Sequence, residues 1–241
     1  MEEHVIFTDK LTKTFGPFTA VNQISFAVEA GEIFGFLGAN GAGKTTALRM
    51  LSGLLKPTSG IAMVAGVDVM RHPEQVKRRI GYMSQKFSLY EDLTIRENIR
   101  FYGGIYGLSV QTIREKTKKL VDKLELGAHV DELVLRLPLG WRQKLALSVA
   151  MLHEPRIVFL DEPTSGVDPL TRRQFWDLIY EAAADGVTLM VTTHYMEEAE
   201  YCNRVSMMVD GKIEALDTPG ELKKTYHATS MDEVFRKLAR G

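Results

Sequence analysis

The chain has 241 residues, of which 45% are hydrophobic and 25% charged, with a formal net charge of −1 at pH 7. This composition is typical of a globular protein, and the balanced charge disfavours a dedicated nucleic-acid binder, which usually carries an excess of basic residues. The single cysteine excludes an internal disulfide framework, no apolar run reaches the 18 residues of a membrane-spanning helix, and the N-terminus shows no secretory pattern.

The first 36 residues predict strands. Ile24, Phe26 and Val28 alternate with other residues, which is typical of a half-buried strand. The short apolar run IFGFLG then ends at a glycine loop, and the loop is followed by the helical stretch KTTALRMLSGLL. A strand, a glycine loop and a helix in this order are the structural context that supports a phosphate-binding motif.

The segment from about 92 to 136 predicts helices. Thr94 and Glu97 have the spacing of a capping box, which favours a helix start. Ile113, Leu120 and Leu124 have the spacing of one face of an amphipathic helix. This segment is therefore predicted to be a helical insert.

From residue 141 the chain alternates helix and strand again. The apolar runs RIVFLDEP and VTLMVTTH predict parallel strands that are covered on both faces. The stretch RVSMMVDGKIEAL predicts a hairpin with Asp210-Gly211 at its turn. The last 12 residues predict an amphipathic helix that begins at a second capping box, formed by Ser230 and Glu233.

The motif GANGAGKTT fits the pattern G-x-x-x-x-G-K-[ST], whose glycines let backbone N–H groups turn towards phosphate oxygens. We expect Lys44 to reach the β- and γ-phosphates and the Thr45 hydroxyl to bind Mg²⁺. A plain glycine turn is the alternative. The predicted nucleotide-binding residues are Gly38, Ala39, Asn40, Gly41, Ala42, Gly43, Lys44, Thr45 and Thr46.

Two carboxylates end the apolar run IVFLDE. Burying such a pair is costly unless the carboxylates meet a cation, so Asp161 is expected to hold Mg²⁺ directly or through water. Glu162 is expected to act as the general base on the attacking water. A strand that simply runs into an acidic turn is the alternative.

Together these motifs resemble the ATP-binding cassette (ABC) family of ATPases, over essentially the whole chain. Four further positions match the family's motifs: Gln85 the Q-loop, Asp168 the D-loop, His194 the switch histidine and Phe15 the aromatic that stacks on adenine. The resemblance implies that Gln85 contacts Mg²⁺ and the water, and that His194 contacts the γ-phosphate. Taken singly, each residue has a structural alternative: Gln85 as a polar turn residue, His194 as a histidine at a strand end and Phe15 as a core aromatic.

The resemblance implies an α/β fold: a P-loop NTPase (RecA-like) parallel sheet core with an antiparallel β subdomain and a small helical insert. A single domain is expected over 1–241. Its core and β subdomain would cover about 1–91 and 148–215, its helical subdomain about 92–147 and its tail about 216–241. The wording of the motifs is most similar to ATPases of ABC-2 type exporters, and among these to the second ATPase half of YbhF-type tandem subunits.

This resemblance also implies the partners and the location. ATP and Mg²⁺ would be bound, transmembrane permease subunits would carry the substrate, and nucleic acid is not an expected partner. The chain would lie in the cytoplasm, peripheral on the inner face of the cell membrane. Phe87, Leu89 and Tyr90 are candidates for the contact with the membrane subunits, with packing inside the helical insert as the alternative.

The stretch LPLGWRQ departs from the family's signature, LSGGQ, which binds the γ-phosphate on a partner domain. Pro138 offers neither hydroxyl nor N–H, Leu139 adds bulk, and Gly140 keeps its N–H at the start of a helix expected over 141–152. Losing one or two hydrogen bonds to a charged group would weaken ATP clamping by about ten- to a thousandfold. We therefore expect a second ABC ATPase domain, in another chain or in tandem, with a homodimer as the alternative.

Two other functions remain open at this point. A soluble ABC-type ATPase that acts on ribosomes or DNA usually carries long coiled-coil, basic or zinc-binding inserts, and the insert here is short. A P-loop kinase would need an acceptor pocket and a lid, which the sequence does not identify. The leading prediction is the ATP-hydrolysing subunit of an exporter.

Overall fold

A six-stranded sheet forms the centre of the computed structural model, which describes residues 4–85 and 89–240. The strand order is β10-β9-β3-β8-β7-β6, and all neighbours are parallel except β9 and β10. The strands are β3 (Ile33–Gly38), β6 (Ile80–Met83), β7 (Ile157–Asp161), β8 (Thr188–Thr193), β9 (Arg204–Val209) and β10 (Lys212–Asp217). The hairpin expected at Asp210-Gly211 is confirmed, and both turn residues have positive φ.

The central strands are buried at every residue, as their continuous apolar runs predict. Successive side chains point to opposite faces, so Phe34 and Phe36 join one hydrophobic core while Ile33 and Leu37 join another. The sheet therefore separates two hydrophobic cores. Polar side chains lie at the edge of the sheet where its parallel strands end.

A second, antiparallel sheet covers one of these cores. Its order is β2-β1-β4-β5, with β1 (Ile6–Phe15), β2 (Phe18–Val28), β4 (Ser59–Val64) and β5 (Val67–Asp68). The alternation predicted for Ile24, Phe26 and Val28 is confirmed, since all three are buried. Phe26 stacks on Phe34 of the central sheet with ring centroids 5.5 Å apart, which joins the two sheets.

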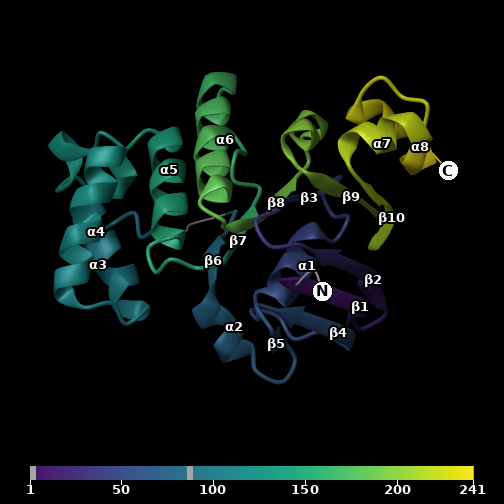
Figure 1. The fold of residues 1–241 in the computed structure, drawn as a ribbon, viewed down its shortest axis with the longest axis horizontal. Coiled ribbons are helices and arrows are strands. Elements are labelled where there is room, and N and C mark those ends of the chain that lie inside the picture. The colour runs from purple at the N-terminus through teal and green to yellow at the C-terminus, as the bar shows by residue number, and fades with distance from the viewer. Residues whose placement is uncertain (1–3, 86–88, 241) are drawn as a thin grey trace.

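Helices cover the sheets and extend beyond them (Figure 1). In Figure 1, α3, α4 and α5 stand to one side of the central sheet, next to α6, and α7 and α8 lie at the opposite end. The helices are α1 (Lys44–Leu51), α2 (Pro73–Arg79), α3 (Ile95–Ile105), α4 (Val110–Lys123), α5 (Leu139–Ala150), α6 (Pro169–Ala184), α7 (Pro219–Thr225) and α8 (Met231–Arg240), with 3-10 turns η1 (Gly127–His129), η2 (Val134–Arg136) and η3 (Met196–Tyr201). No helix in the described ranges is both long and apolar enough to cross a bilayer.

Local capping signals set several helix ends. The Thr94–Glu97 capping box is confirmed, with both of its reciprocal hydrogen bonds in place. The second box is formed only in part: Ser230 Oγ accepts from the N–H of Glu233, but the Glu233 carboxylate accepts from Thr229 instead of Ser230. Hydrogen bonds from Thr229 and Lys237 to its carboxylate lower the pKa of Glu233 to about 2.

Candidate functional site

The predicted site residues follow the carboxyl ends of four parallel strands. The glycine loop follows β3, Asp161 ends β7, His194 comes directly after β8, and Gln85 lies two residues beyond β6. These four strands are adjacent in the order β3-β8-β7-β6. Parallel strands end at one edge of the sheet, where open α/β sheets bind their ligands, so the topology gathers the side chains there.

The glycine loop adopts backbone conformations that side chains resist. Gly41 and Gly43 have φ values of 84° and 105°. A Cβ at Gly43 would lie 2.4 Å from the carbonyl oxygen of Ala20, so this position has neither the dihedral angle nor the room for another residue. The loop leads directly into α1, whose first-turn N–H groups have no partner within the helix and can donate to an anion.

Lys44 is buried beneath this loop. Its Nζ donates to the carbonyl oxygens of Gly38 and Ala39, at 2.8 and 3.1 Å, and lies 3.6 Å from Glu162 Oε1. Burial lowers the pKa of Lys44, while the neighbouring Glu162 carboxylate opposes this shift. The lysine is therefore held by two carbonyl oxygens and a buried carboxylate at the end of the loop that is expected to bind phosphate.

Asp161 accepts two hydroxyl hydrogen bonds on one oxygen. Thr45 Oγ1 and Thr192 Oγ1 donate to its Oδ1 at 2.9 and 2.8 Å. Burial raises the pKa of Asp161, and the two hydrogen bonds oppose this shift. Thr192 was not among the predicted site residues. Its position two residues before His194, at the end of a strand adjacent to the strand of Asp161, is the signal that could have identified it.

Glu162 is the residue on which the site converges. Its Oε2 accepts from Gln85 Nε2 at 2.9 Å and lies 3.1 Å from His194 Nδ1, although the latter approach lacks the alignment of a hydrogen bond. Its backbone is in the left-handed region, with φ 48°, and its N–H donates to both the carbonyl and hydroxyl oxygens of Thr192. Strained backbone of this kind clusters at functional sites, where the surrounding structure holds it.

A cleft of about 240 Å³ opens beside Glu162. Gln85 and Glu162 line it together with Leu139 and Gln143 of α5. Arg142 also lines it and donates to the carboxylate of Glu91 at 2.8 Å. The altered signature helix therefore borders the same cleft as the acid and the glutamine of its own chain.

The signature helix begins two residues earlier than predicted. The helix expected over 141–152 spans Leu139–Ala150, because Pro138 stands at the N-cap and its carbonyl accepts from the N–H groups of Trp141 and Arg142. A Cβ at Gly140 would lie 2.3 Å from Thr171 Cγ2 of α6. Thr171 in turn donates to Asp168, which caps α6. Gly140 and the D-loop aspartate are thus neighbours through one threonine.

Phe15 lies at the end of β1 in the antiparallel sheet with 49% of its surface exposed. The Nζ of Lys13 lies 5.0 Å from its ring centroid. An exposed aromatic at a strand end is available for stacking, which excludes the alternative that Phe15 is a core residue.

The candidate residues for the contact with a membrane subunit differ in their exposure to solvent. Leu89 is 7% exposed and packs in the hydrophobic core, which agrees with the alternative interpretation that it packs inside the insert. Tyr90 is 47% exposed and packs edge-to-face on Phe101. Phe87 lies outside the described residues.

The residues present fit a nucleotide with Mg²⁺. Thr45 and Asp161 place a hydroxyl and a carboxylate side by side, which are the oxygen ligands that Mg²⁺ prefers. Within 4–85 and 89–240, no three His, Cys, Asp or Glu side chains gather as a metal site. Mg²⁺ typically keeps waters and shares phosphate oxygens, so a single carboxylate and a hydroxyl at the end of a phosphate loop suffice.

Comparison with known proteins agrees with this geometry. A family model described as "ABC transporter" matches residues 21–165. The "Probable multidrug ABC transporter ATP-binding protein YbhF" of Escherichia coli (strain K12) is 50% identical over 221 residues, covering 92% of this chain and 38% of that protein. The "Nod factor export ATP-binding protein I" of Paraburkholderia xenovorans (strain LB400) is 36% identical over 236 residues, covering 98% of this chain and 78% of that protein.

A solved structure shows the same fold. "Dimeric Structure of MJ0796, a Bacterial ABC Transporter Cassette" superposes with a TM-score of 0.81 at 25% identity, covering 88% of this chain and 98% of that chain. The predicted fold class, a parallel sheet core with an antiparallel β sheet, is thereby confirmed. The family model alone covers more than half of the chain, which spans only 38% of YbhF. The chain belongs to the ABC transporter family, and it is an ATP-binding cassette domain of that family.

Proposed function

We propose that the chain binds and hydrolyses Mg-ATP to drive export by separate membrane subunits. The observation that carries this proposal is the convergence of Lys44, Gln85 and His194 on Glu162 at the ends of four parallel strands. Each side chain follows a different strand, so the sheet order brings together groups that are far apart in the sequence. The Nod factor relative is described as an export protein, which supports the direction of transport.

The geometry assigns a role to each group. The N–H groups of the glycine loop and Lys44 would hold the phosphates, and Phe15 would stack on the adenine. Glu162 would take a proton from the attacking water, with Gln85 donating to its carboxylate and His194 lying beside it. Bound Mg²⁺, held by Thr45 and Asp161, would polarise the phosphate oxygens. Glu162 and Gln85 would orient this water for in-line attack.

We further propose that a second ABC ATPase domain completes the site. The solved MJ0796 cassette is a dimer, and YbhF is more than twice as long as the stretch matched here. In this chain Pro138 brings no capping side chain to the N-terminus of α5, and Leu139, 45% exposed, stands where the family has glycine. The chain's own half-site keeps its residues, so a partner with an intact signature would restore what this signature lacks.

The contact with the membrane subunits would involve the exposed aromatic pair Tyr90 and Phe101, at the junction of the Gln85 segment and α3. We place the helical subdomain at about 92–147, between the core segments and ahead of the tail at about 216–241. The chain would then lie in the cytoplasm against the inner face of the membrane. Tyr90→Ser should reduce the fraction of the chain that sediments with membranes, whereas Phe18→Ser, also exposed but on the antiparallel sheet, should not.

The experiment that tests the core of the proposal uses Glu162→Gln, which should trap bound ATP. Its mass in solution would be measured with and without Mg-ATP. An ATP-dependent dimer would mean that LPLGWRQ still closes a site and that a homodimer is the working unit. A monomer that binds ATP would direct the search to a different ATPase domain. Failure to bind ATP at all would overturn the proposal.

The relatives named above give no support to action on ribosomes or DNA. Stable co-purification with ribosomes or DNA at moderate salt would revive that alternative. A kinase reaction would be recognised by a phosphorylated acceptor in place of free phosphate.

A further inference from the structure

A wholly buried acid, Glu198, lies outside the set of residues assigned to ATP. It belongs to η3, which begins two residues after His194. Its Oε1 accepts from Thr164 Oγ1 at 2.6 Å and lies 3.6 Å from Arg172 Nε, while its Oε2 has no hydrogen-bond partner among the described residues. Burying a carboxylate is costly, and an apolar side chain of similar volume would avoid this cost. We therefore look to the contacts with Thr164 and Arg172 for the role of Glu198.

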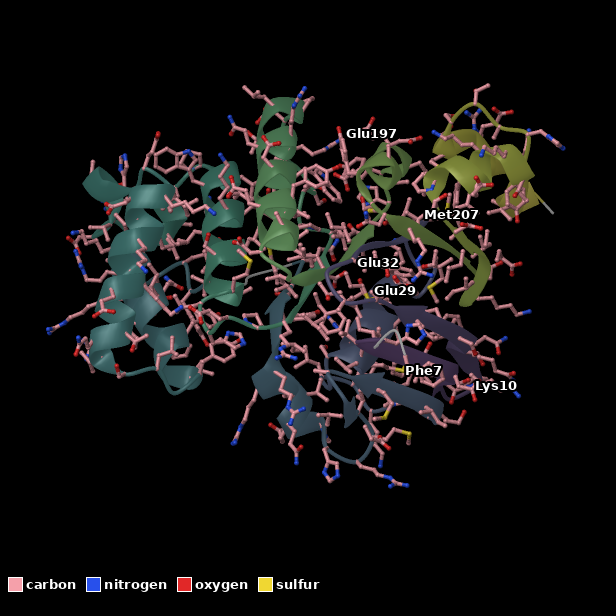
Figure 2. All side chains as sticks on the ribbon, in the orientation of Figure 1. Phe7, Lys10, Glu29, Glu32, Glu197 and Met207 are labelled. Carbon is pink, nitrogen blue, oxygen red and sulfur yellow. The ribbon has the colours of Figure 1, made fainter. Side chains whose placement is uncertain are left out.

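Arg172 extends this cluster towards the switch histidine. Its guanidinium forms an ion pair with Glu197 and lies 4.1 Å from the ring centroid of Tyr195. The ring of Tyr195 lies 4.2 Å from that of His194. Figure 2 shows Glu197 on η3 beside α6, the helix that carries Arg172. One arginine of α6 thus contacts three residues of the segment that follows β8.

The two residues that meet Glu198 flank the D-loop. Thr164 precedes residues 165–168, and Arg172 lies one turn beyond Asp168, which caps α6. Thr164 also comes two residues after Glu162. The loop is therefore attached at both ends to the segment of His194, through one buried carboxylate. A displacement of the loop relative to η3 would move or break these contacts.

We propose that Glu198 is a positioning residue that couples the D-loop to His194 through Thr164 and Arg172. These contacts, one a hydrogen bond and one an ion pair, would transmit a shift of the D-loop to the histidine beside Glu162. The inference rests on the proposed ATPase function for its kinetic consequence. The physical coupling between Glu198 and His194 does not depend on hydrolysis.

The kinetic test compares Glu198→Gln with Glu200→Gln in the full chain, in the assembly that hydrolyses ATP. Glutamine at 198 keeps the acceptor for Thr164 and removes the charge that faces Arg172. Glu200 belongs to the same 3-10 helix but forms an exposed ion pair with Lys223, so it is the matched control. Glu198→Gln should lower kcat at least tenfold with KM for ATP within twofold, and Glu200→Gln should leave both unchanged.

Two variants trace the path of this effect. Thr164→Val removes the hydroxyl that donates to Glu198 at constant volume and should reproduce the loss of kcat. In a His194→Ala background, Glu198→Gln should cause no further loss, because the effect passes through the histidine. A loss that persists in full in that background would overturn the proposal. So would a fall in thermal stability with kcat unchanged at 25 °C, which is the mark of a purely structural acid.

A spectroscopic readout separates this inference from the proposed function. The imidazole signals of the full chain would be recorded by NMR with ¹³C-labelled histidine, and the His194 signal would be identified by its loss in His194→Ala. Glu198→Gln should shift that signal, and Glu200→Gln should leave it in place. This result would support the coupling even in a chain that hydrolyses no ATP. An unshifted signal would overturn it whatever the activity.

Discussion

Lys44 Nζ lies 3.6 Å from Glu162 Oε1, and the exposed fractions of the two side chains are only 4% and 7%. The lysine expected to bind phosphate is thus paired with the acid expected to activate water. Binding of a triphosphate would draw Lys44 towards the phosphates and loosen its hold on Glu162. The carboxylate would then be left with Gln85 and His194, the partners it needs as a base.

The first prediction concerns this pair. Lys44→Ala should abolish ATP binding and lower the free energy of unfolding by about 3 kcal/mol, the lower end of the cost of breaking a buried pair, because Gln85 still donates to Glu162. Chemical denaturation without nucleotide would measure this loss. Adding Glu162→Ala should recover part of the stability, since no unpaired carboxylate remains. Strictly additive losses would show that the two charges do not interact.

The second prediction concerns the pH dependence set by Asp161. Its raised pKa means that the folded chain takes up the proton first as pH falls, so the ionised group destabilises the fold above its folded pKa. Asp161→Asn, which can still accept from both threonines, should therefore raise the melting temperature at pH 7 in the absence of nucleotide. The difference from the unsubstituted chain should shrink as pH falls and vanish below the ordinary value of 3.8. A pH series of thermal melts measures it.

The third prediction concerns Gly140. Gly140→Ala should cost about 1–3 kcal/mol in the free energy of unfolding, because its Cβ would overlap Thr171 Cγ2. Thr171→Ser removes that methyl group and keeps the hydroxyl that donates to Asp168. The double variant should recover most of the stability in a denaturation series. If it does not, the glycine is required for some reason other than its contact with α6.

The fourth prediction concerns the altered signature. Pro138→Ser with Leu139→Gly, introduced into the Glu162→Gln chain, should strengthen ATP-dependent association at least tenfold, because a hydroxyl and open space return to the start of α5. Sedimentation at graded ATP concentrations gives the association constant. Lys144→Gln on the same helix, which loses only an exposed contact with Gln174, is the control. An unchanged constant in the restored chain would show that this face closes no ATP site.

Much of the fold was predicted from sequence because its signals are local. The strand runs of β7 and β8 and the capping box at Thr94 depend on neighbours within a few residues. The predictions that erred were also local ones. Helix α5 begins two residues earlier than predicted because Pro138 serves as its N-cap without a capping side chain. The Glu233 carboxylate accepts from Thr229 and not, as predicted, from Ser230.

The sequence by itself predicted the chemistry, since the spacing G-x-x-x-x-G-K-T and the two acids after an apolar run indicate a triphosphate site without a structure. Only the tertiary structure decided which side chains meet. Gln85 and Glu162 are 77 residues apart, and Thr164 and Glu198 are 34 apart, yet both pairs are in hydrogen-bond contact. The physical reason is that parallel strands end at one edge, so residues there become neighbours through sheet order and not through spacing along the chain.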